Sequence, residues 1–230
     1  MIKVLRDSES IERAALYLED HKLARHHDRL KNWDLSLLHQ VTISMPRSIK
    51  IIDLGCSGLA ALKFFYFLKF KDIYGIDLTV NRKEKRTRTF LMLKSLSLTP
   101  PFHLTAGDLT KTNFPDQFFD LATCISVIEH GVDLQAFFAE MDRIVKPGGS
   151  LFITTDYWPD KMEPREGERP CGLPYNIFSK NEILQLIKLA GSHGFSLYEN
   201  SDILDPLEKN ILGDIYRHTF ICLVFRKTIV

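Results

Sequence analysis

Short runs of β-branched and aromatic residues alternate with longer stretches of helical periodicity along most of this 230-residue chain. The apolar runs cover residues 50–54, 72–76, 118–123 and 150–154, and the helix-like stretches cover 59–69, 81–96, 133–145 and 179–193. Strands that alternate with helices of this length predict βαβ units around a parallel sheet. Because the runs are almost continuously apolar, we expect helices on both faces of that sheet.

The chain is expected to form a single domain, residues 1–230, in which two segments lie outside this alternation. Residues 1–46 are mostly helical in pattern and predict an N-terminal extension before a core of residues 47–157. Residues 158–178 contain four prolines among mixed charges, which is typical of a lid or binding loop, although an ordinary surface loop would have the same composition. In the C-terminal part, residues 179–230, two strands at 195–198 and 218–225 lack a long helix between them. This pattern predicts a last strand that runs antiparallel to the others.

Charge and cysteine usage exclude several classes of protein. The chain has 30 Lys and Arg residues against 29 Asp and Glu, and a net charge of +1 argues against a dedicated nucleic-acid or anionic-membrane protein. No apolar run reaches the length of about 18 residues that a membrane span needs, and residues 1–10 lack the apolar region of a signal peptide. The four cysteines lie far apart with no CxxC pair, which suits reduced thiols. We therefore expect a cytoplasmic protein that does not bind a membrane.

Glycine and aspartate residues follow the first two predicted strands. The first strand ends in residues 53–58, Asp-Leu-Gly-Cys-Ser-Gly, and leads directly into a helical pattern. A glycine turn at that place lets a ligand approach the backbone, and the helix N-terminus offers unpaired N–H groups. The second strand ends in Asp77, where an α/β fold binds ribose hydroxyls. Together these residues indicate a nucleoside-type ligand at the carboxyl edge of the sheet.

The next two strands end in polar residues as well. Asp108, within the sequence Gly107-Asp108-Leu109, follows the third strand and is placed to bind an adenine amino group. The fourth strand ends in residues 124–130, Cys-Ile-Ser-Val-Ile-Glu-His, which puts polar groups where a substrate would meet a cofactor. Each acid could instead be a solvated loop carboxylate or a helix N-cap.

In this order and spacing, the motifs of residues 48–156 resemble the class I S-adenosylmethionine-dependent methyltransferases of the small-molecule kind. The resemblance rests on the glycine loop at 52–56, on Asp77, on Asp108, on the stretch from 119 to 130, and on the Arg-Ile-Val-Lys-Pro-Gly-Gly turn at 143–149. It implies a Rossmann-like, seven-stranded, mostly parallel α/β sheet with an antiparallel last strand and helices on both faces. It also implies S-adenosyl-L-methionine as cofactor and S-adenosyl-L-homocysteine as product. The cofactor-binding residues that it implies are Asp53, Gly55, Cys56, Ser57, Gly58, Asp77, Leu78, Asp108, Leu109 and Ile125.

The glycine loop departs from the family pattern at two positions. Ser57 and Leu59 stand where the family usually has its second and third glycine. Serine is a tolerable replacement, but Leu59 needs room where glycine allows close helix–strand packing. The departure leaves open a non-catalytic, methyltransferase-like interaction module, and it argues against a nicotinamide enzyme, whose fingerprint requires the third glycine.

His130 is the candidate catalytic residue. A hydroxyl acceptor must lose its proton during methyl transfer, and histidine titrates in the range that such a base needs. We therefore expect an O-methyltransferase acting on a small-molecule or sugar-like acceptor, such as a sugar or a natural-product intermediate. A structural role for His130 is the alternative. Candidate substrate-binding residues are Asp156, Tyr157 and Trp158 after the fifth strand, and Tyr175 and Arg165 on the insertion. Glu129, Asp133 and Asp156 show no recognisable ligand spacing, so no metal site is predicted.

A basic stretch opens the helix predicted at 81–96. It contains Arg82, Lys83, Lys85, Arg86, Arg88 and Lys94. Such a stretch could bind RNA phosphates, which makes an RNA methyltransferase a further alternative, but a solvated helix face is the favoured interpretation. We expect a small molecule rather than nucleic acid as the partner, and the sequence leaves the acceptor and the oligomeric state open.

Overall fold

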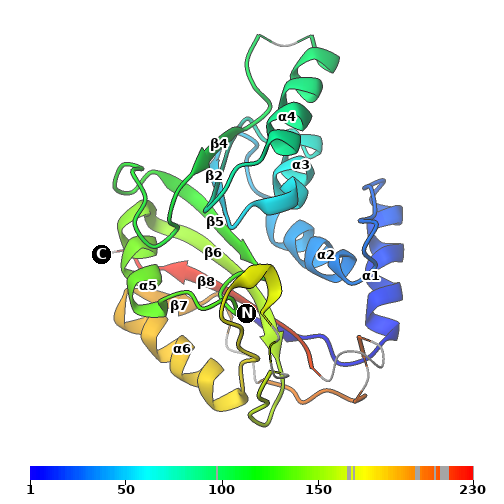
Figure 1. Ribbon diagram of the computed structural model, residues 1–230, viewed down its shortest axis with the longest axis vertical. Helices are drawn as coiled ribbons and strands as arrows, with labels where there is room; N and C mark the ends of the chain where they lie inside the picture. Colours follow the sequence, from blue (N-terminus) through cyan, green and yellow to red (C-terminus); the bar gives the residue numbers. More distant parts are fainter. Residues whose placement is uncertain are drawn as a thin grey trace.

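A single mixed sheet forms the centre of the computed structural model, which describes residues 1–230 except 97, 165, 166, 168, 200–202, 210, 213–217 and 230. The strand order is β1-β8-β6-β5-β2-β3-β4, and β7 pairs with β8 (Figure 1). The strands are β1 (Ile2–Val4), β2 (Lys50–Leu54), β3 (Asp72–Asp77), β4 (His103–Ala106), β5 (Phe119–Ile125), β6 (Val145–Tyr157), β7 (Phe195–Leu197) and β8 (Thr219–Lys227). The helices are α1 (Glu9–Asp20), α2 (Lys31–Thr42), α3 (Ala60–Phe67), α4 (Arg82–Lys94), α5 (Leu134–Ile144) and α6 (Lys180–Ser192), with 3-10 turns η1 (Ser57–Leu59) and η2 (Pro170–Gly172).

The expected strand directions are confirmed. Strands β4, β3, β2, β5 and β6 are parallel neighbours, and β8 runs antiparallel to β6. The sheet has one strand more than expected, because Ile2–Val4 of the N-terminal extension pairs antiparallel with β8, Ile2 opposite Leu223. The antiparallel register also places Phe220, at the start of β8, opposite Asp156, near the end of β6. The start of β8 therefore lies at the same edge of the sheet as the carboxyl ends of the parallel strands.

Two apolar layers cover the two faces of the sheet. Helices α1, α2 and α3 pack on one face, and α5 and α6 pack on the other (Figure 1). Ile51 belongs to the first core and its neighbour Ile52 to the second, as do Phe152 and Ile153 on β6. This separation follows from the pleat, which turns successive side chains of a strand to opposite faces.

The expected helix caps are present. The Asp133 carboxylate accepts a hydrogen bond from the backbone N–H of Ala136 at the start of α5. Ser179 and Glu182 form the capping box of α6, each side chain accepting from the other's backbone N–H. These caps satisfy N–H groups that a helix start would otherwise leave unpaired.

Residues 158–178 return to the carboxyl edge of the sheet. The backbone N–H of Trp158 donates to the Phe178 carbonyl, and an isolated bridge joins Met162 to Ile177. Arg165 lies outside the described residues. In the part of the chain that the structure describes, no helix combines the length and apolar character required to cross a bilayer.

Candidate functional site

The turn after β2 requires glycine at its first position. Gly55 has φ +75°, and its backbone N–H donates to the Ile76 carbonyl at 2.8 Å. A Cβ atom at this position would lie 2.4 Å from Cγ2 of Val127, which follows β5. The turn is therefore bound to β3 on one side and pressed against the chain after β5 on the other.

Leu59 adopts a left-handed backbone conformation, which glycine takes more readily than leucine. It has φ +61° at the start of α3, and its side chain is 2% exposed in the core beneath α3. The left-handed conformation costs a leucine about 1–2 kcal/mol. Burial of the side chain contributes about 1.5–3 kcal/mol, which offsets that strain.

Gly55, Asp77 and Asp108 come together at one edge of the sheet. The Asp77 carboxylate accepts hydrogen bonds from the backbone N–H groups of Ser57 and Thr79, both at 3.1 Å. Gly107 N–H donates to the Asp77 carbonyl at 2.8 Å, and the next residue, Asp108, accepts from the N–H and hydroxyl of Thr110. The glycine turn, the end of β3 and the end of β4 are thus joined by direct hydrogen bonds.

The other expected cofactor residues surround this edge at different depths. Asp53 is buried in β2, where the Thr123 hydroxyl donates to it at 2.6 Å, and burial raises its pKa to about 7. Cys56 and Leu109 are buried, Ile125 is half-buried and Leu78 is exposed. Asp53 and Cys56 therefore support the turn from behind, whereas Leu78 lies on the open side.

A cavity of about 210 Å³ opens at the same edge, beyond the end of β5. Five segments that are distant in sequence form its wall. The lining residues are Asp28, Leu30, Lys31, Ser126, Glu129, His130, Asp156, Pro170, Tyr175, Leu212, His218 and Phe220. Of the expected site residues, it brings together His130, Asp156 and Tyr175.

Lys31 carries a positive charge from α2 into this cavity. Its Nζ donates to the Ser126 hydroxyl at 2.6 Å and lies 3.5 Å from the buried Asp34 carboxylate. Burial alone would lower the pKa of Lys31, but the carboxylates of Asp34, Glu129 and Asp156 outweigh it and raise the pKa. Lys31 is therefore a permanent cation within a ring of acids.

Ser126, which receives that hydrogen bond, is held in an unusual conformation. Its φ is +52°, and its backbone N–H donates to the Thr154 carbonyl at 2.9 Å. A left-handed conformation in a residue other than glycine is uncommon, and such strain concentrates at functional sites. Ser126 connects the cofactor edge at Ile125 to the cavity wall.

Two acidic residues, Glu129 and Asp156, lie near each other in the wall of the 210 Å³ cavity. Glu129 is 1% exposed and accepts from the Thr155 hydroxyl at 2.9 Å; burial, helped by the nearby Asp156, raises its pKa to about 8. Asp156 accepts a hydrogen bond from the Tyr175 hydroxyl and lies 3.4 Å from His218 Nε2. Burial and the neighbouring Asp156 therefore favour the protonated form of Glu129.

His130 presents a neutral imidazole to the cavity. Its ring stacks on Tyr175, with centroids 5.8 Å apart and an interplanar angle of 25°. Burial lowers its pKa, and its Nδ1 has no hydrogen-bond partner among the described atoms. A neutral imidazole can accept a proton, so His130 can act as a base in this position.

Some expected substrate residues lie elsewhere. Tyr157 is fully buried in the core beneath α5 and α6, and Trp158 lies beyond it; neither lines the cavity. Asp133 caps α5 and lines a different cavity from Glu129 and Asp156. Among the described residues, no group of three or more His, Cys, Asp or Glu side chains is arranged to hold a metal ion.

The sequence did not reveal Lys31 or His218 as site residues. The sequence pattern could have indicated His218, because the residue before an antiparallel last strand must lie at the carboxyl edge of its parallel neighbours. No sequence pattern indicates Lys31, because only the packing of α2 against the sheet brings it to this edge.

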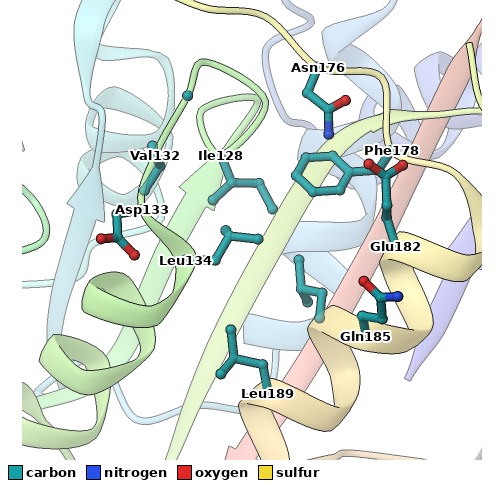
Figure 2. A pocket seen from close by; sticks show the side chains of 11 residues that line it. Ile128, Val132, Asp133, Leu134, Asn176, Phe178, Glu182, Gln185 and Leu189 are labelled. Carbon is teal, nitrogen blue, oxygen red and sulfur yellow. The ribbon is translucent and has the colours of Figure 1, made fainter. Parts of the chain in front are cut away.

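A larger cavity of about 620 Å³ lies between the start of α5 and α6 (Figure 2). Its wall is mostly apolar, with Asp133, Glu182 and Gln185 at its margin (Figure 2). The Glu129–His130 and Tyr175–Asn176 segments separate it from the smaller cavity, and the Asn176 N–H donates to the Glu129 carbonyl at 2.8 Å. Lys31, Glu129 and Asp156 thus belong to the smaller cavity.

Comparison with known proteins supports a methyltransferase. Residues 52–153, less than half of the chain, match the family described as "Methyltransferase domain". This match and solved methyltransferases of similar fold support a class I S-adenosylmethionine-dependent methyltransferase. A solved geranyl diphosphate C-methyltransferase from Streptomyces coelicolor, with S-adenosyl-L-homocysteine bound, has the same fold. It gives a TM-score of 0.64 at 15% identity over 94% of this chain and 84% of that one.

The names of three curated relatives give three different methyl-accepting atoms: carbon, nitrogen and oxygen. Sterol 24-C-methyltransferase erg6 of Aspergillus fumigatus is 28% identical over 177 residues, 74% of this chain and 45% of the relative. Phosphoethanolamine N-methyltransferase 3 of Arabidopsis thaliana is 33% identical over 109 residues, 47% and 21% of the two chains. The ubiquinone biosynthesis O-methyltransferase of Pseudomonas syringae is 31% identical over 106 residues, 46% and 44%. The chain spans less than half the length of each of these relatives.

The residues at the sheet edge fit the family's cofactor, S-adenosylmethionine. A Cβ atom at Gly58 would meet nothing within 4 Å, so the turn is open at that position, whereas Gly55 packs against Val127. A carboxylate offers about four lone-pair sites, and the two described bonds to Asp77 leave others for ribose hydroxyls. Leu78, Leu109 and Ile125 supply apolar side chains around the same edge.

Proposed function

We propose that this protein transfers a methyl group from S-adenosylmethionine to a hydroxyl oxygen of a small, polar acceptor bound in the 210 Å³ cavity. The observation that carries this proposal is the neutral His130 imidazole in the same cavity as the Lys31 ammonium. A base and a cation side by side suit an acceptor that must lose a proton and become negatively polarised. The acid-lined, histidine-containing wall favours a sugar-like acceptor with several hydroxyl groups.

The residues around the turn hold the cofactor in this proposal. Asp77 binds the ribose, Asp108 and Leu109 lie at the adenine, and the Gly55–Gly58 turn approaches the methionine part. When bound, S-adenosylmethionine supplies a methyl group on a positively charged sulfonium sulfur. As the methyl group leaves, the sulfur keeps the electron pair of the broken sulfur–carbon bond and becomes a neutral thioether. The chain must then align the acceptor and exclude water, and such alignment contributes much of the rate of a displacement.

His130 takes the proton of the acceptor hydroxyl as the new oxygen–carbon bond forms. Its buried Nδ1 leaves Nε2 as the nitrogen that accepts. The positive charge of the resulting imidazolium is stabilised by Asp156, whose charge favours the protonated form of His130. Lys31 meanwhile stabilises the negative charge that develops on the acceptor oxygen, because its ammonium has three donors and the contacts to Ser126 and Asp34 leave one.

An amine acceptor is the second candidate. Asp28 and Asp156 outnumber the one cation, Lys31, in the wall of the cavity, which favours a ligand that carries an ammonium group. His130 could take the proton of an amine as it takes that of a hydroxyl.

The insertion at residues 158–178 serves as the lid of this site in our proposal. Pro170 and Tyr175 from the insertion line the cavity, and Tyr175 reaches both Asp156 and His130. Closing such a segment over the acceptor would exclude water. We place the reaction in the cytoplasm because Cys56, Cys124 and Cys222 are free buried thiols, which persist in a reducing compartment.

Two measurements test the proposal. Calorimetric titration with S-adenosylmethionine should give a saturable heat with one site per chain. Incubation with methyl-labelled cofactor and a set of small polyols, paired with amines of the same carbon skeleton, should then label the polyols. Label on the amines alone would favour the second candidate, and folded protein that gives no heat would refute cofactor binding.

Substitution of the base separates chemistry from binding. His130→Gln should lower kcat by about 10²- to 10⁴-fold while cofactor affinity stays unchanged, because the imidazole acts on the acceptor. The matched control is His193→Gln, since His193 lies at the end of α6 and hydrogen-bonds to Gln135 on α5. Equal rates in the two variants would assign His130 a structural role.

A further inference from the structure

Helix α4 projects from the body of the molecule with one side facing solvent. In Figure 1 its C-terminal end and the loop toward β4 form the upper extremity of the molecule. The inner side is held through Glu84, which is 6% exposed and accepts hydrogen bonds from Gly58 and Asn81. Arg82, Lys83, Arg86, Phe90 and Leu93 are all exposed and follow one another on the outward side at helical spacing.

The outward side of α4 concentrates positive charge in a chain that is nearly neutral. Six residues of the helix are cations: Arg82, Lys83, Lys85, Arg86 and Lys94 are exposed, and Arg88, one turn after the inward-facing Glu84, is half-buried. Glu84 is the one acid of the helix. No described acidic side chain forms an ion pair with any of the six. The net charge of +1 for the whole chain therefore conceals a strongly basic surface.

Large apolar side chains form the tip of the same surface. Phe90 and Leu93 are 62% and 64% exposed, and Leu96 and Leu98, in the loop after the helix, are almost fully exposed at 93% and 101%. Single exposed leucines are ordinary, but four large apolar side chains that are exposed within nine residues concentrate apolar surface at this extremity, as interaction sites do.

We propose that the α4 surface, defined as the six cations with Phe90, Leu93, Leu96 and Leu98, docks on anionic phospholipid membranes. Basic side chains attract anionic headgroups, and apolar side chains beyond them enter the boundary between headgroups and acyl chains. The surface has both parts in this order, with the apolar tip outermost. The docking is peripheral and does not depend on the proposed methyl transfer.

Charge and composition favour a membrane over other occupants. RNA would use the cations and could stack a base on Phe90, but Leu93, Leu96 and Leu98 offer no stacking surface and would stay in water. A second copy of the chain would place six cations against six cations. An anionic bilayer complements both the charge and the apolar tip.

The apolar tip of the α4 surface lies away from the cofactor edge. Helix α4 begins at Arg82, after its N-cap Asn81, and has 13 residues, so its far end lies about 20 Å from the glycine turn. Arg82 and Lys83 lie at the near end, next to that turn.

Vesicle co-sedimentation tests the proposal. The protein should sediment with phosphatidylcholine vesicles that contain about one third phosphatidylserine, should not sediment with pure phosphatidylcholine, and should release at high salt because screening weakens the attraction. Arg82→Gln combined with Lys83→Gln and Arg86→Gln should weaken binding on the order of 100-fold. Phe90→Ser combined with Leu93→Ser should weaken it about tenfold or more.

Matched variants control for charge, apolarity and folding. Lys22→Gln with Lys188→Gln and Lys209→Gln removes three exposed cations away from α4, and Leu184→Ser removes an exposed leucine from α6. These variants should bind vesicles like the parent, and circular dichroism should show all variants folded. Equal losses in test and control variants would overturn the proposal, as would the absence of vesicle binding. Stronger binding to single-stranded RNA than to vesicles, or a dimer that the Phe90 and Leu93 changes dissociate, would also overturn it.

Discussion

Substitution of Gly55 by alanine separates the two reasons for glycine in the turn after β2. The first reason is conformational, because φ is +75° and a residue with a Cβ pays about 1–2 kcal/mol there. The second is steric, because the new Cβ would lie 2.4 Å from Cγ2 and 2.8 Å from Cγ1 of Val127. Overpacking of this kind costs about 1–3 kcal/mol. Gly55→Ala should therefore lower the free energy of unfolding by about 2–5 kcal/mol.

Gly58 offers a matched control within the same turn. It has φ +74°, but a Cβ there would meet nothing within 4 Å. Gly58→Ala should therefore cost only the conformational part, about 1–2 kcal/mol. Urea unfolding of the two variants, monitored by circular dichroism, measures the difference.

The steric part should depend on Val127. Val127→Ala removes both methyl groups that the new Cβ would meet, so the double variant Gly55→Ala/Val127→Ala should show a favourable coupling of about 1 kcal/mol or more. If Gly55→Ala costs no more than Gly58→Ala and shows no coupling to Val127, the close approach of the turn to the chain after β5 is refuted.

Three further predictions concern ionisable residues. Asp77→Asn should weaken S-adenosyl-L-homocysteine binding by about 1–3 kcal/mol in calorimetry, because ribose hydroxyls lose a charged acceptor, and an unchanged affinity would remove Asp77 from the site. Because burial lowers the pKa of His130 below its usual 6.5, the base stays neutral down to lower pH, so kcat/KM should fall with acid only below pH 6.5; a limb above that value would contradict the assignment. Burial raises the pKa of Asp53 to about 7 from 3.8, so the folded state holds a proton that the unfolded state releases, and stability should fall as pH rises between these values. Urea unfolding across this range should show a smaller fall in Asp53→Asn than in the parent, because Glu129, whose pKa is also raised, still contributes to the fall in the variant.

Local sequence patterns were sufficient for most of the sheet. The apolar runs and the caps at Asp133 and Ser179 depend on neighbouring residues, and the structure places strands and helices there. Strand β1 could not be predicted in the same way, because three residues at the N-terminus form a strand only by pairing with residues 221–223. Its stability comes from contacts at the other end of the chain.

In the candidate site, tertiary packing gives some side chains positions that the local sequence pattern did not predict. The fifth strand was expected to end at residue 154, but it continues to Tyr157, and the alternation of side chains then turns Asp156 and Tyr157 to opposite faces. Asp156 consequently joins the cavity, while Tyr157 enters the core. The left-handed conformations of Leu59 and Ser126 likewise follow from tertiary contacts, since neither residue type favours them.

A crystal structure with S-adenosyl-L-homocysteine bound would show where the cofactor lies. We expect adenosine across the turn at Gly55, ribose hydroxyls on the Asp77 carboxylate, the adenine beside Asp108, and the sulfur facing the cavity that holds His130 and Lys31. Ligand bound elsewhere, such as in the larger cavity between α5 and α6, with the Gly55 turn and Asp77 left untouched, would contradict this expectation.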